Sequence, residues 1–362
     1  MHQIWEIPKN QNLIQLFLIF NLSLITIVFK NSGKLTMKEI QNYNEIINIL
    51  KSPNFWIIGQ TDHNFDPNVH ASLRQVFVKV LQENQALIRD KIEQICNKNL
   101  ERLANNNKTF DLQRDFSFEF CNELAFALLD VQVWEFQSML QEAAWDIFYM
   151  NDAEEKYKRG EEASMRMAAY FMEALRTHKS EHKTGLLAAF AANTDGGAAS
   201  IGHIVQLFAG TITSLSLLLG NAISALLQYP EQLTIYLKNP EAALNELLRI
   251  AGPSQIIYRK VSDENSAFEK DTILALNLHK ANRDPQVFEN PKQLDFGCPH
   301  AGQLSLGKGA HSCLGAPLIR MVLAVVPKLF FEKLPNLEAN LSSIEISGCK
   351  DIKGVYRLEI KC

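Results

Sequence analysis

A glycine-rich segment around one cysteine is the part of this sequence best suited to chemistry. It reads Leu306-Gly307-Lys308-Gly309-Ala310-His311-Ser312-Cys313-Leu314-Gly315-Ala316-Pro317. Glycine permits backbone angles and close approaches that a Cβ forbids, so Gly315 would let a flat ligand lie against the helix that follows. A cysteine at a helix N-terminus has a lowered thiol pKa, because N–H groups and the helix dipole favour the thiolate. A thiolate is a good soft-metal ligand; the alternative is a buried structural cysteine in a glycine-rich turn.

The segment resembles the haem-binding signature of the cytochrome P450 family, Phe-Gly-x-Gly-x-His/Arg-x-Cys-x-Gly. Every fixed position matches except the first, where Leu306 stands in place of Phe. The resemblance implies haem b as the cofactor and Cys313 as the axial thiolate ligand of its iron. It also places Leu306, Gly307 and Gly315 among the cofactor-binding residues.

Four further segments resemble other marks of the family and occur in the family's order. They are His70-Ala71-Ser72-Leu73-Arg74, Ala209-Gly210-Thr211-Ile212-Thr213-Ser214, Glu246-Leu247-Leu248-Arg249 and Ala281-Asn282-Arg283-Asp284-Pro285.

Two of these patterns occur twice in the chain. Glu173 and Arg176 share the spacing of Glu246 and Arg249, and His279 and Arg283 share that of the histidine and arginine pattern. Either Glu-x-x-Arg copy could be a solvated ion pair of little energetic value. Position in the chain selects Glu246 and Arg249, which the resemblance makes a buried structural pair linked to the loop before the cysteine.

A buried haem needs partners for its two carboxylates. Arginine is suited to this because its guanidinium fork binds a carboxylate bidentately. The resemblance assigns the role to His70, Arg74, Arg259 and His311. The alternative for each is a basic residue on the surface. Lys308 is expected on the proximal surface, where an acidic electron donor could dock.

The segment around Thr213 resembles the family's distal wall, above the haem face opposite the cysteine. Thr213 is the expected catalytic residue, which donates to or positions a water, and Ala209 is expected to contact the haem. Phe208, Ile212 and Ile256 are expected to line an apolar substrate pocket. The alternative for Phe208 is simple core packing.

Four positions depart from the family's pattern. Ile212 occupies the place of an acid that helps relay protons, and Leu306 replaces an aromatic residue near the thiolate, where packing and solvent access affect the haem potential. Cys298 stands about where many relatives have an arginine, and Gln303 where some have a histidine. Anchoring of the carboxylates is therefore expected to be weaker or shared differently.

Hydrophobic periodicity predicts a mainly helical protein with a small β region, an α+β fold of the cytochrome P450 type with a long distal helix over a buried haem. Asn42 is expected to cap a helix that buries Ile46, Ile47 and Leu50. We expect one domain over 1–362, with 30–60 and 254–362 supplying the β part and 69–250 the helical body. Within it the expected elements are a hairpin of 24–30 with 34–40, a helix over 200–228, strands over 254–260 and 272–278, and a last hairpin of 344–346 with 355–360.

The N-terminal stretch from Leu13 to Phe29 is apolar but interrupted by polar residues. A spanning helix needs about 18 or more apolar residues with few interruptions, and the first residues lack the marks of a signal peptide. A short buried helix that runs into a strand is favoured over a membrane anchor.

Composition limits the class of protein. The chain has 362 residues, 47% hydrophobic and 21% charged, with a net charge of −4. This is ordinary for a globular protein, and it lacks the basic excess of a nucleic-acid binder. Six cysteines without a Cys-x-x-Cys pair indicate free thiols in a reducing compartment, hence a cytoplasmic protein.

The resemblance implies an oxidoreductase of the monooxygenase type. It would insert one oxygen atom from O2 into a largely apolar small molecule, as an enzyme of secondary metabolism. A ferredoxin or flavodoxin with its NAD(P)H reductase would supply electrons to a monomer. Two alternatives stay open: a related enzyme that couples, cyclises or uses peroxide, suggested by Ile212, and a non-catalytic haem-binding protein.

Overall fold

The structure is a computed structural model that describes most of the chain. The described residues are 36–57, 66–106, 109–131, 134–149, 154–180, 185–194, 196–262, 267–297 and 302–361. They form two compact units, each built from stretches that are separate in sequence. The first unit includes Trp56–Asn84 and Phe126–Gly210, and the second comprises Thr36–Phe55, Gln85–Ala125 and Thr211–Cys362.

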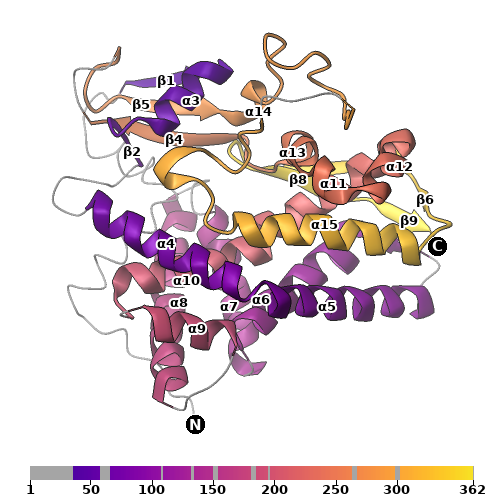
Figure 1. Cartoon of the computed structure of the whole chain (residues 1–362), viewed down its shortest axis with the longest axis horizontal. Coiled ribbons are helices and arrows are strands. Elements are labelled where there is room, and N and C mark those ends of the chain that lie inside the picture. Colours follow the sequence, from indigo (N-terminus) through magenta and orange to yellow (C-terminus); the bar gives the residue numbers. More distant parts are fainter. Residues whose placement is uncertain are drawn as a thin grey trace. The chain divides into compact units, whose positions relative to one another are not determined.

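The first unit is helical (Figure 1). Its helices are α4 (Pro67–Glu83), α7 (Trp134–Tyr149), α8 (Glu154–Ser180), α9 (Leu186–Asn193) and α10 (Ala198–Gly210). The α10 helix packs on α4, α7 and α8, and α9 packs on α4 and α8. The α4 helix begins with Pro67 after an Asp66 cap, whose side chain accepts from the backbone N–H groups of Asn68 and Val69.

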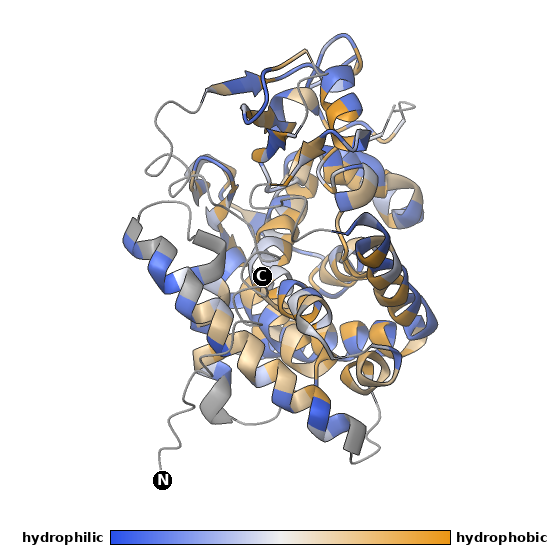
Figure 2. Ribbon diagram, turned by 90° about the vertical axis from the view of Figure 1, so that its left-hand side faces the viewer, coloured by the Kyte–Doolittle hydropathy of each residue, from blue (hydrophilic) through white to orange (hydrophobic). Residues whose placement is uncertain are grey.

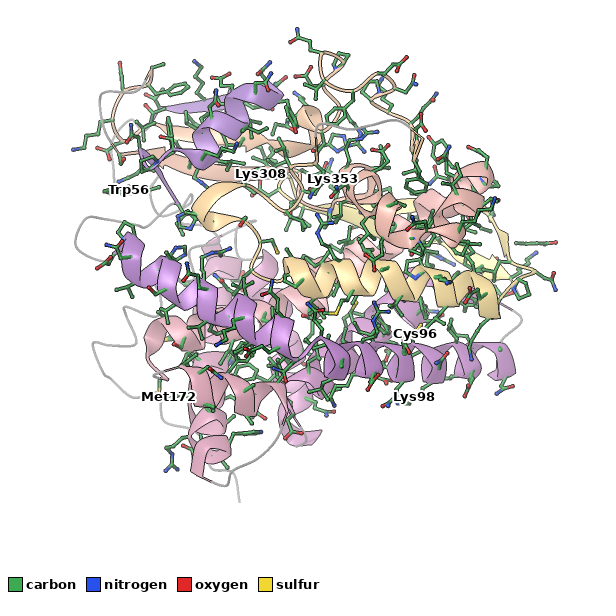
Figure 3. All side chains as sticks on the ribbon, in the orientation of Figure 1. Trp56, Cys96, Lys98, Met172, Lys308 and Lys353 are labelled. Carbon is green, nitrogen blue, oxygen red and sulfur yellow. The ribbon has the colours of Figure 1, made fainter. Side chains whose placement is uncertain are left out.

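The second unit holds the remaining helices. They are α3 (Tyr43–Lys51), α5 (Gln85–Asn106), α6 (Glu119–Leu128, whose last residues belong to the first unit), α11 (Ser216–Gln228), α12 (Pro230–Lys238), α13 (Pro240–Ala251), α14 (Leu278–Ala281) and α15 (Ala316–Lys333), with the π-helical segments η1 (Leu112–Phe118) and η2 (Thr211–Leu215) and the 3₁₀ turns η3 (Gly309–His311) and η4 (Leu341–Ser343). The α15 helix packs against α5, α11 and α13. Cys96 lies buried on the side of α5 that faces α15, and Lys98 projects from the other side (Figure 3).

Three small sheets complete the second unit. The largest has the order β1 (Met37–Ile40), β5 (Ile273–Asn277), β4 (Ile256–Val261) and β2 (Phe55–Trp56), with β1 parallel and β4 antiparallel to β5. The second has the order β3 (Thr109–Asp111), β9 (Glu359–Lys361) and β6 (Glu338–Ala339). The third pairs β7 (Glu345–Gly348) with β8 (Lys353–Arg357).

Most of the expected elements are present. The two expected strands after residue 253 are β4 and β5, and the last hairpin is β7 with β8. Its second strand, expected to reach residue 360, ends at Arg357, and Glu359–Lys361 forms the separate strand β9, which pairs with β3 and β6. Asn42 caps α3 by accepting from the backbone N–H of Glu45 at 3.0 Å. The hairpin expected near the N-terminus has a different outcome: β1 is a strand, but its described partner is the distant β5, in parallel register. Residues 24–30 and the apolar stretch 13–29 lie outside the described residues.

The expected long apolar helix runs from Ala198 through η2 to Gln228 with a change of helical geometry at Thr211–Leu215. By length and composition, the part from Ala199 to Gln228 is the single described helix that could cross a membrane, but 78% of its apolar window is buried inside the protein. Such burial is what a core helix shows. Other helices carry polar and apolar residues on the same ribbon (Figure 2), as partly exposed helices do.

Candidate active site

Short backbone hydrogen bonds shape the loop that carries Cys313. The N–H of Cys313 donates to the carbonyl of Leu306 at 2.7 Å, and the N–H of Gly307 donates to that of Leu304 at 2.8 Å. Cys313 is partly exposed, forms no disulfide and precedes the α15 helix, whose N-cap is Gly315. The loop therefore presents a thiol at the entrance of a helix, as the sequence predicts.

Two glycines give this loop its course. Gly307 and Gly309 have φ values of +66° and +73°, which side chains rarely adopt. Around Gly307 there is room for a Cβ, since the nearest atom would be 3.6 Å away. At Gly309 a Cβ would collide with the carbonyl oxygen of Leu50 at the end of α3. Gly309 therefore permits a close approach of two backbones as well as a left-handed turn.

Glu246 and Arg249 form a buried, bidentate ion pair on α13. Arg249 Nε and Nη2 donate to the two carboxylate oxygens at 2.6 and 2.7 Å. The side chains are 3% and 1% exposed. The other copy of the pattern, Glu173 with Arg176, is 38% and 77% exposed. The structure thus separates two copies that spacing alone could not distinguish.

The remaining donors of Arg249 bind backbone carbonyls of the segment that follows α14. Nη1 donates to the carbonyls of Asn282 and Pro291 at 2.9 and 2.7 Å, and Nη2 donates to that of Gln293 at 2.8 Å. Arg249 thereby ties α13 to three points of an irregular segment that has little secondary structure of its own.

Asn282 continues these hydrogen bonds to the segment before the cysteine loop. Its Oδ1 accepts from the N–H of Leu304 at 2.8 Å, and its Nδ2 donates to Ser305 Oγ at 2.9 Å. Ser305 Oγ in turn donates to the carbonyl of Leu248 at 2.7 Å. A continuous set of bonds thus runs from α13 to the residues just before Gly307. Spacing did not indicate this role of Asn282, although the residue lies in one of the family-like segments.

Arg259 on β4 is a buried cation that lacks a counter-ion among the described residues. It is 6% exposed and donates to the carbonyl of Tyr258 at 2.8 Å. Burial lowers the pKa of its guanidinium to about 10, and no acid contributes to the shift. A buried charge without a partner is costly, so this position is suited to an anionic ligand. His311, the second expected anchor in this unit, lies half-buried in η3.

The expected distal segment contains the change in helical geometry. Ile212 and Thr213 lie within the π-helical η2 and are fully buried. Ser216 Oγ donates to the carbonyl of Thr213 at 2.8 Å. Single π-helical turns inside longer helices are frequent at functional sites. Ile256, the first residue of β4, is partly exposed.

The first unit contributes the α4 pair and the end of α10. His70 and Arg74 are one turn apart on the same face of α4. Burial, and then the charge of Arg74, lower the pKa of His70 to about 4. Phe208 is enclosed by the rings of Phe126 and Phe171, with centroids 5.4 and 5.3 Å away, which is the packing of a core residue. Its role in the pocket stays a prediction.

The expected site residues are divided between the units. His70, Arg74, Phe208 and Ala209 belong to the first, and Ile212, Thr213, Ile256, Arg259, Leu306, Gly307, His311, Cys313 and Gly315 to the second. Of the two departures near the loop, Cys298 lies outside the described residues. Gln303 is buried and accepts from the N–H of Leu306 at 3.1 Å, so it helps to hold the loop.

Curated relatives and solved structures are consistent with one family. No protein-family model matches the chain. It is 25% identical over 350 residues to putative cytochrome P450 133B1 of Xylella fastidiosa. That alignment covers 91% of this chain and 86% of the relative. It is 27% identical over 289 residues to cytochrome P450 107B1 of Saccharopolyspora erythraea, in an alignment that covers 76% of this chain and 70% of the relative.

Solved structures share the fold at lower sequence identity. Cytochrome P450 PksS of the Bacillus subtilis 168 bacillaene polyketide synthase superposes with a TM-score of 0.78 at 21% identity, over 90% of each chain. Cytochrome P450mel 107F1 does so with a TM-score of 0.79 at 18% identity, over 91% of each. Over most of its length the chain is similar to members of the cytochrome P450 family, in sequence and in fold. The α+β fold of this type, expected from the sequence, is confirmed.

Members of the cytochrome P450 family bind haem b, so haem b is the cofactor expected for this protein. The described residues fit such a group. Arg259 is a buried cation in need of an anion, and haem carries two carboxylates. The cysteine loop offers a partly exposed sulfur beside left-handed glycines. The assignment of each residue to the haem stays a prediction.

The buried Glu246–Arg249 pair should be essential to the stability of the protein. Glu246→Gln leaves the Arg249 charge without a counter-ion, so we expect a loss of about 3–5 kcal/mol in the free energy of unfolding, measured by urea titration. Glu173→Gln, the same change in the exposed copy, should leave the urea midpoint almost unchanged because solvent screens that pair. Equal effects of the two substitutions would contradict this interpretation.

Comparison of Gly309→Ala with Gly307→Ala should reveal the effect of the close approach between Gly309 and the Leu50 carbonyl. Each change to alanine imposes a left-handed backbone on a side chain, at a cost of about 1–2 kcal/mol. Gly309→Ala adds the collision with the Leu50 carbonyl, so we expect a clearly lower unfolding temperature and lower haem content than for Gly307→Ala. Identical values for the two variants would show that strain alone matters.

Proposed function

We propose that this protein is a haem-thiolate monooxygenase that inserts one oxygen atom from O2 into a largely apolar small molecule. The observation that carries this proposal is the cysteine loop held by the Glu246–Arg249 and Asn282 hydrogen bonds in a chain of the cytochrome P450 family. When bound, a haem with a thiolate ligand supplies the activation of dioxygen. The protein supplies the ligand, the burial and the orientation of the substrate.

Each cofactor-binding residue has a proposed part. Cys313 would supply the thiolate ligand of the haem iron, and Leu306, Gly307 and Gly315 would help to hold the haem. Arg259 and His311 bind one or both carboxylates from the second unit, and His70 and Arg74 bind a carboxylate from the first. The buried, unpaired charge of Arg259 supports this most directly.

Thr213 is the proposed catalytic residue. Its hydroxyl would hold a water or donate a proton beside the substrate, and its burial in the π-helical turn excludes bulk water. Ile212 cannot relay protons, so a bound water or a substrate group takes the part of the missing acid. Ala209 contacts the haem, and Phe208, Ile212 and Ile256 form the apolar wall of the pocket.

Electrons come from a separate partner in this proposal. A ferredoxin or flavodoxin, reduced by an NAD(P)H reductase, would dock near Lys308, which is partly exposed and lies on the cysteine loop. We propose that the enzyme works as a cytoplasmic monomer. Secondary metabolism is proposed because one structural neighbour belongs to a polyketide synthase.

A second candidate is oxidation without hydroxylation, by coupling, cyclisation or use of peroxide. Ile212 favours it, because this position lacks the acid that supports the usual delivery of protons. The solved structure of P450mel 107F1 carries the description "with biaryl coupling reactivity", so such chemistry occurs on this fold. A haem-binding protein without catalysis is the third, and the buried Thr213 argues against it.

Replacement of Ile212 tests the first candidate against the second. Ligands that shift the ferric haem spectrum toward high spin would first identify a substrate. Turnover with a surrogate ferredoxin and reductase is then followed as oxygen consumed against product formed. Ile212→Glu restores an acid beside Thr213, so we expect a severalfold higher fraction of coupled oxygen consumption, whereas Ile212→Leu should behave as the native protein.

An unchanged coupling ratio in Ile212→Glu would favour oxidation without hydroxylation. Absence of turnover with every surrogate redox pair, and with peroxide, would favour the non-catalytic candidate.

A further inference from the structure

His203 on α10 has a buried nitrogen that lacks a hydrogen-bond partner in the described part of the chain. The residue is 4% exposed, and its Nδ1 is enclosed and unpaired. An unpaired buried polar atom costs about 1–3 kcal/mol, and such atoms often mark an absent water or ligand. Phenylalanine would fill similar space without this cost, so packing alone does not explain a histidine here.

Two basic residues of α4 lie beside His203 in the same unit. The ring of His70 is 6.2 Å from that of His203, centroid to centroid. Arg74 is close enough to lower the pKa of both histidines. Three nitrogen-bearing side chains from two helices therefore gather at one place, with α4 contributing two of them.

Aromatic packing fixes the ring of His203 in this position. Its centroid lies 4.9 Å from that of Phe77, one turn beyond Arg74 on α4. Phe77 in turn stacks on Phe190 of α9 at 4.4 Å. Because Phe77 and Phe190 are fully buried, the imidazole has little freedom to turn toward another partner.

The charges of this cluster favour an anion with several acceptor sites. Burial is the main cause that lowers the pKa of His70 and of His203 to about 4, and no carboxylate contributes to either shift. At neutral pH both imidazoles are uncharged, each with one N–H donor, and Arg74 supplies the positive charge. A carboxylate, with about four lone pairs, matches such a set of donors.

We propose that His203 is a third residue of a haem-carboxylate site on α4, where its imidazole donates, directly or through one bound water, to the carboxylate held by His70 and Arg74. This inference rests on the proposed function, in which those two residues bind the haem. The residue lies outside every family-like segment of the sequence, and its burial and unpaired nitrogen are what reveal it.

The test compares His203→Phe and His203→Gln in the haem-loaded protein. Phenylalanine keeps the contact with Phe77 but removes the donor, so we expect haem transfer to excess apomyoglobin to accelerate about tenfold, without a lower far-UV unfolding temperature. Glutamine restores a donor and should transfer haem within threefold of the native rate. Resonance Raman should show a shifted propionate bending band in both variants.

His178→Phe is the matched control. His178 is also buried in the first unit, but its ring nitrogens have partners in the carbonyl of Ala174 and the carboxylate of Asp130. Loss of these bonds should lower the unfolding temperature and leave the rate of haem transfer unchanged. This pattern is the opposite of the one expected for His203→Phe.

Haem transfer from His203→Phe within twofold of the native rate would overturn the inference. The inference would also be overturned if haem transfer were accelerated equally in the phenylalanine and glutamine variants and both had lower unfolding temperatures. That result would mean that His203 acts only through its packing. Should His203→Phe fail to fold, an unchanged propionate band in His203→Gln overturns the inference alone. Failure of the proposed function gives a different result. In that case the ferrous–carbon monoxide spectrum of the native protein would lack a thiolate signature.

Discussion

The guanidinium of Arg249 imposes the constraint on which the candidate site depends. It is almost fully buried, so its five N–H donors must find acceptors. Two donate to the carboxylate of Glu246 and three to the backbone carbonyls of Asn282, Pro291 and Gln293. The cation also lies over the ring of Phe288, at 4.8 Å from its centroid. An irregular stretch of chain is thereby fixed to α13 and carries the segment before the cysteine loop with it.

Comparison of two buried arginines in the second unit separates a structural role from a ligand-binding one. Arg249 has a carboxylate partner and a full set of acceptors. Arg259 is nearly as buried, yet it donates to one neighbouring carbonyl and has no described acid beside it, which lowers its pKa to about 10. Burial alone does not distinguish the two residues. Their hydrogen-bond partners distinguish them. The same comparison distinguishes two buried histidines of the first unit, because the ring nitrogens of His178 have partners and Nδ1 of His203 has none among the described residues.

Local features of the fold could be predicted from the sequence, because their causes lie within a few residues. The Asn42 cap, the strands β4 and β5 and the β7–β8 hairpin are of this kind. The parallel pairing of β1 with β5 joins residues more than half the chain apart, and no local pattern contains it. The π-helical turn at Thr213, the choice between two Glu-x-x-Arg copies and the link through Asn282 depend on tertiary burial. His203 likewise appears ordinary in an apolar helix until its surroundings are known.

The central claim is that the sulfur of Cys313 binds the haem iron. Reduction of the purified protein under carbon monoxide tests it most directly, because a thiolate ligand shifts the Soret band of that complex strongly to the red. We expect the red-shifted band in the native protein and in Cys349→Ala, a change at another partly exposed cysteine of the same unit, and its loss in Cys313→Ala. A native spectrum without this band, or a Cys313→Ala spectrum that retains it, would contradict the account.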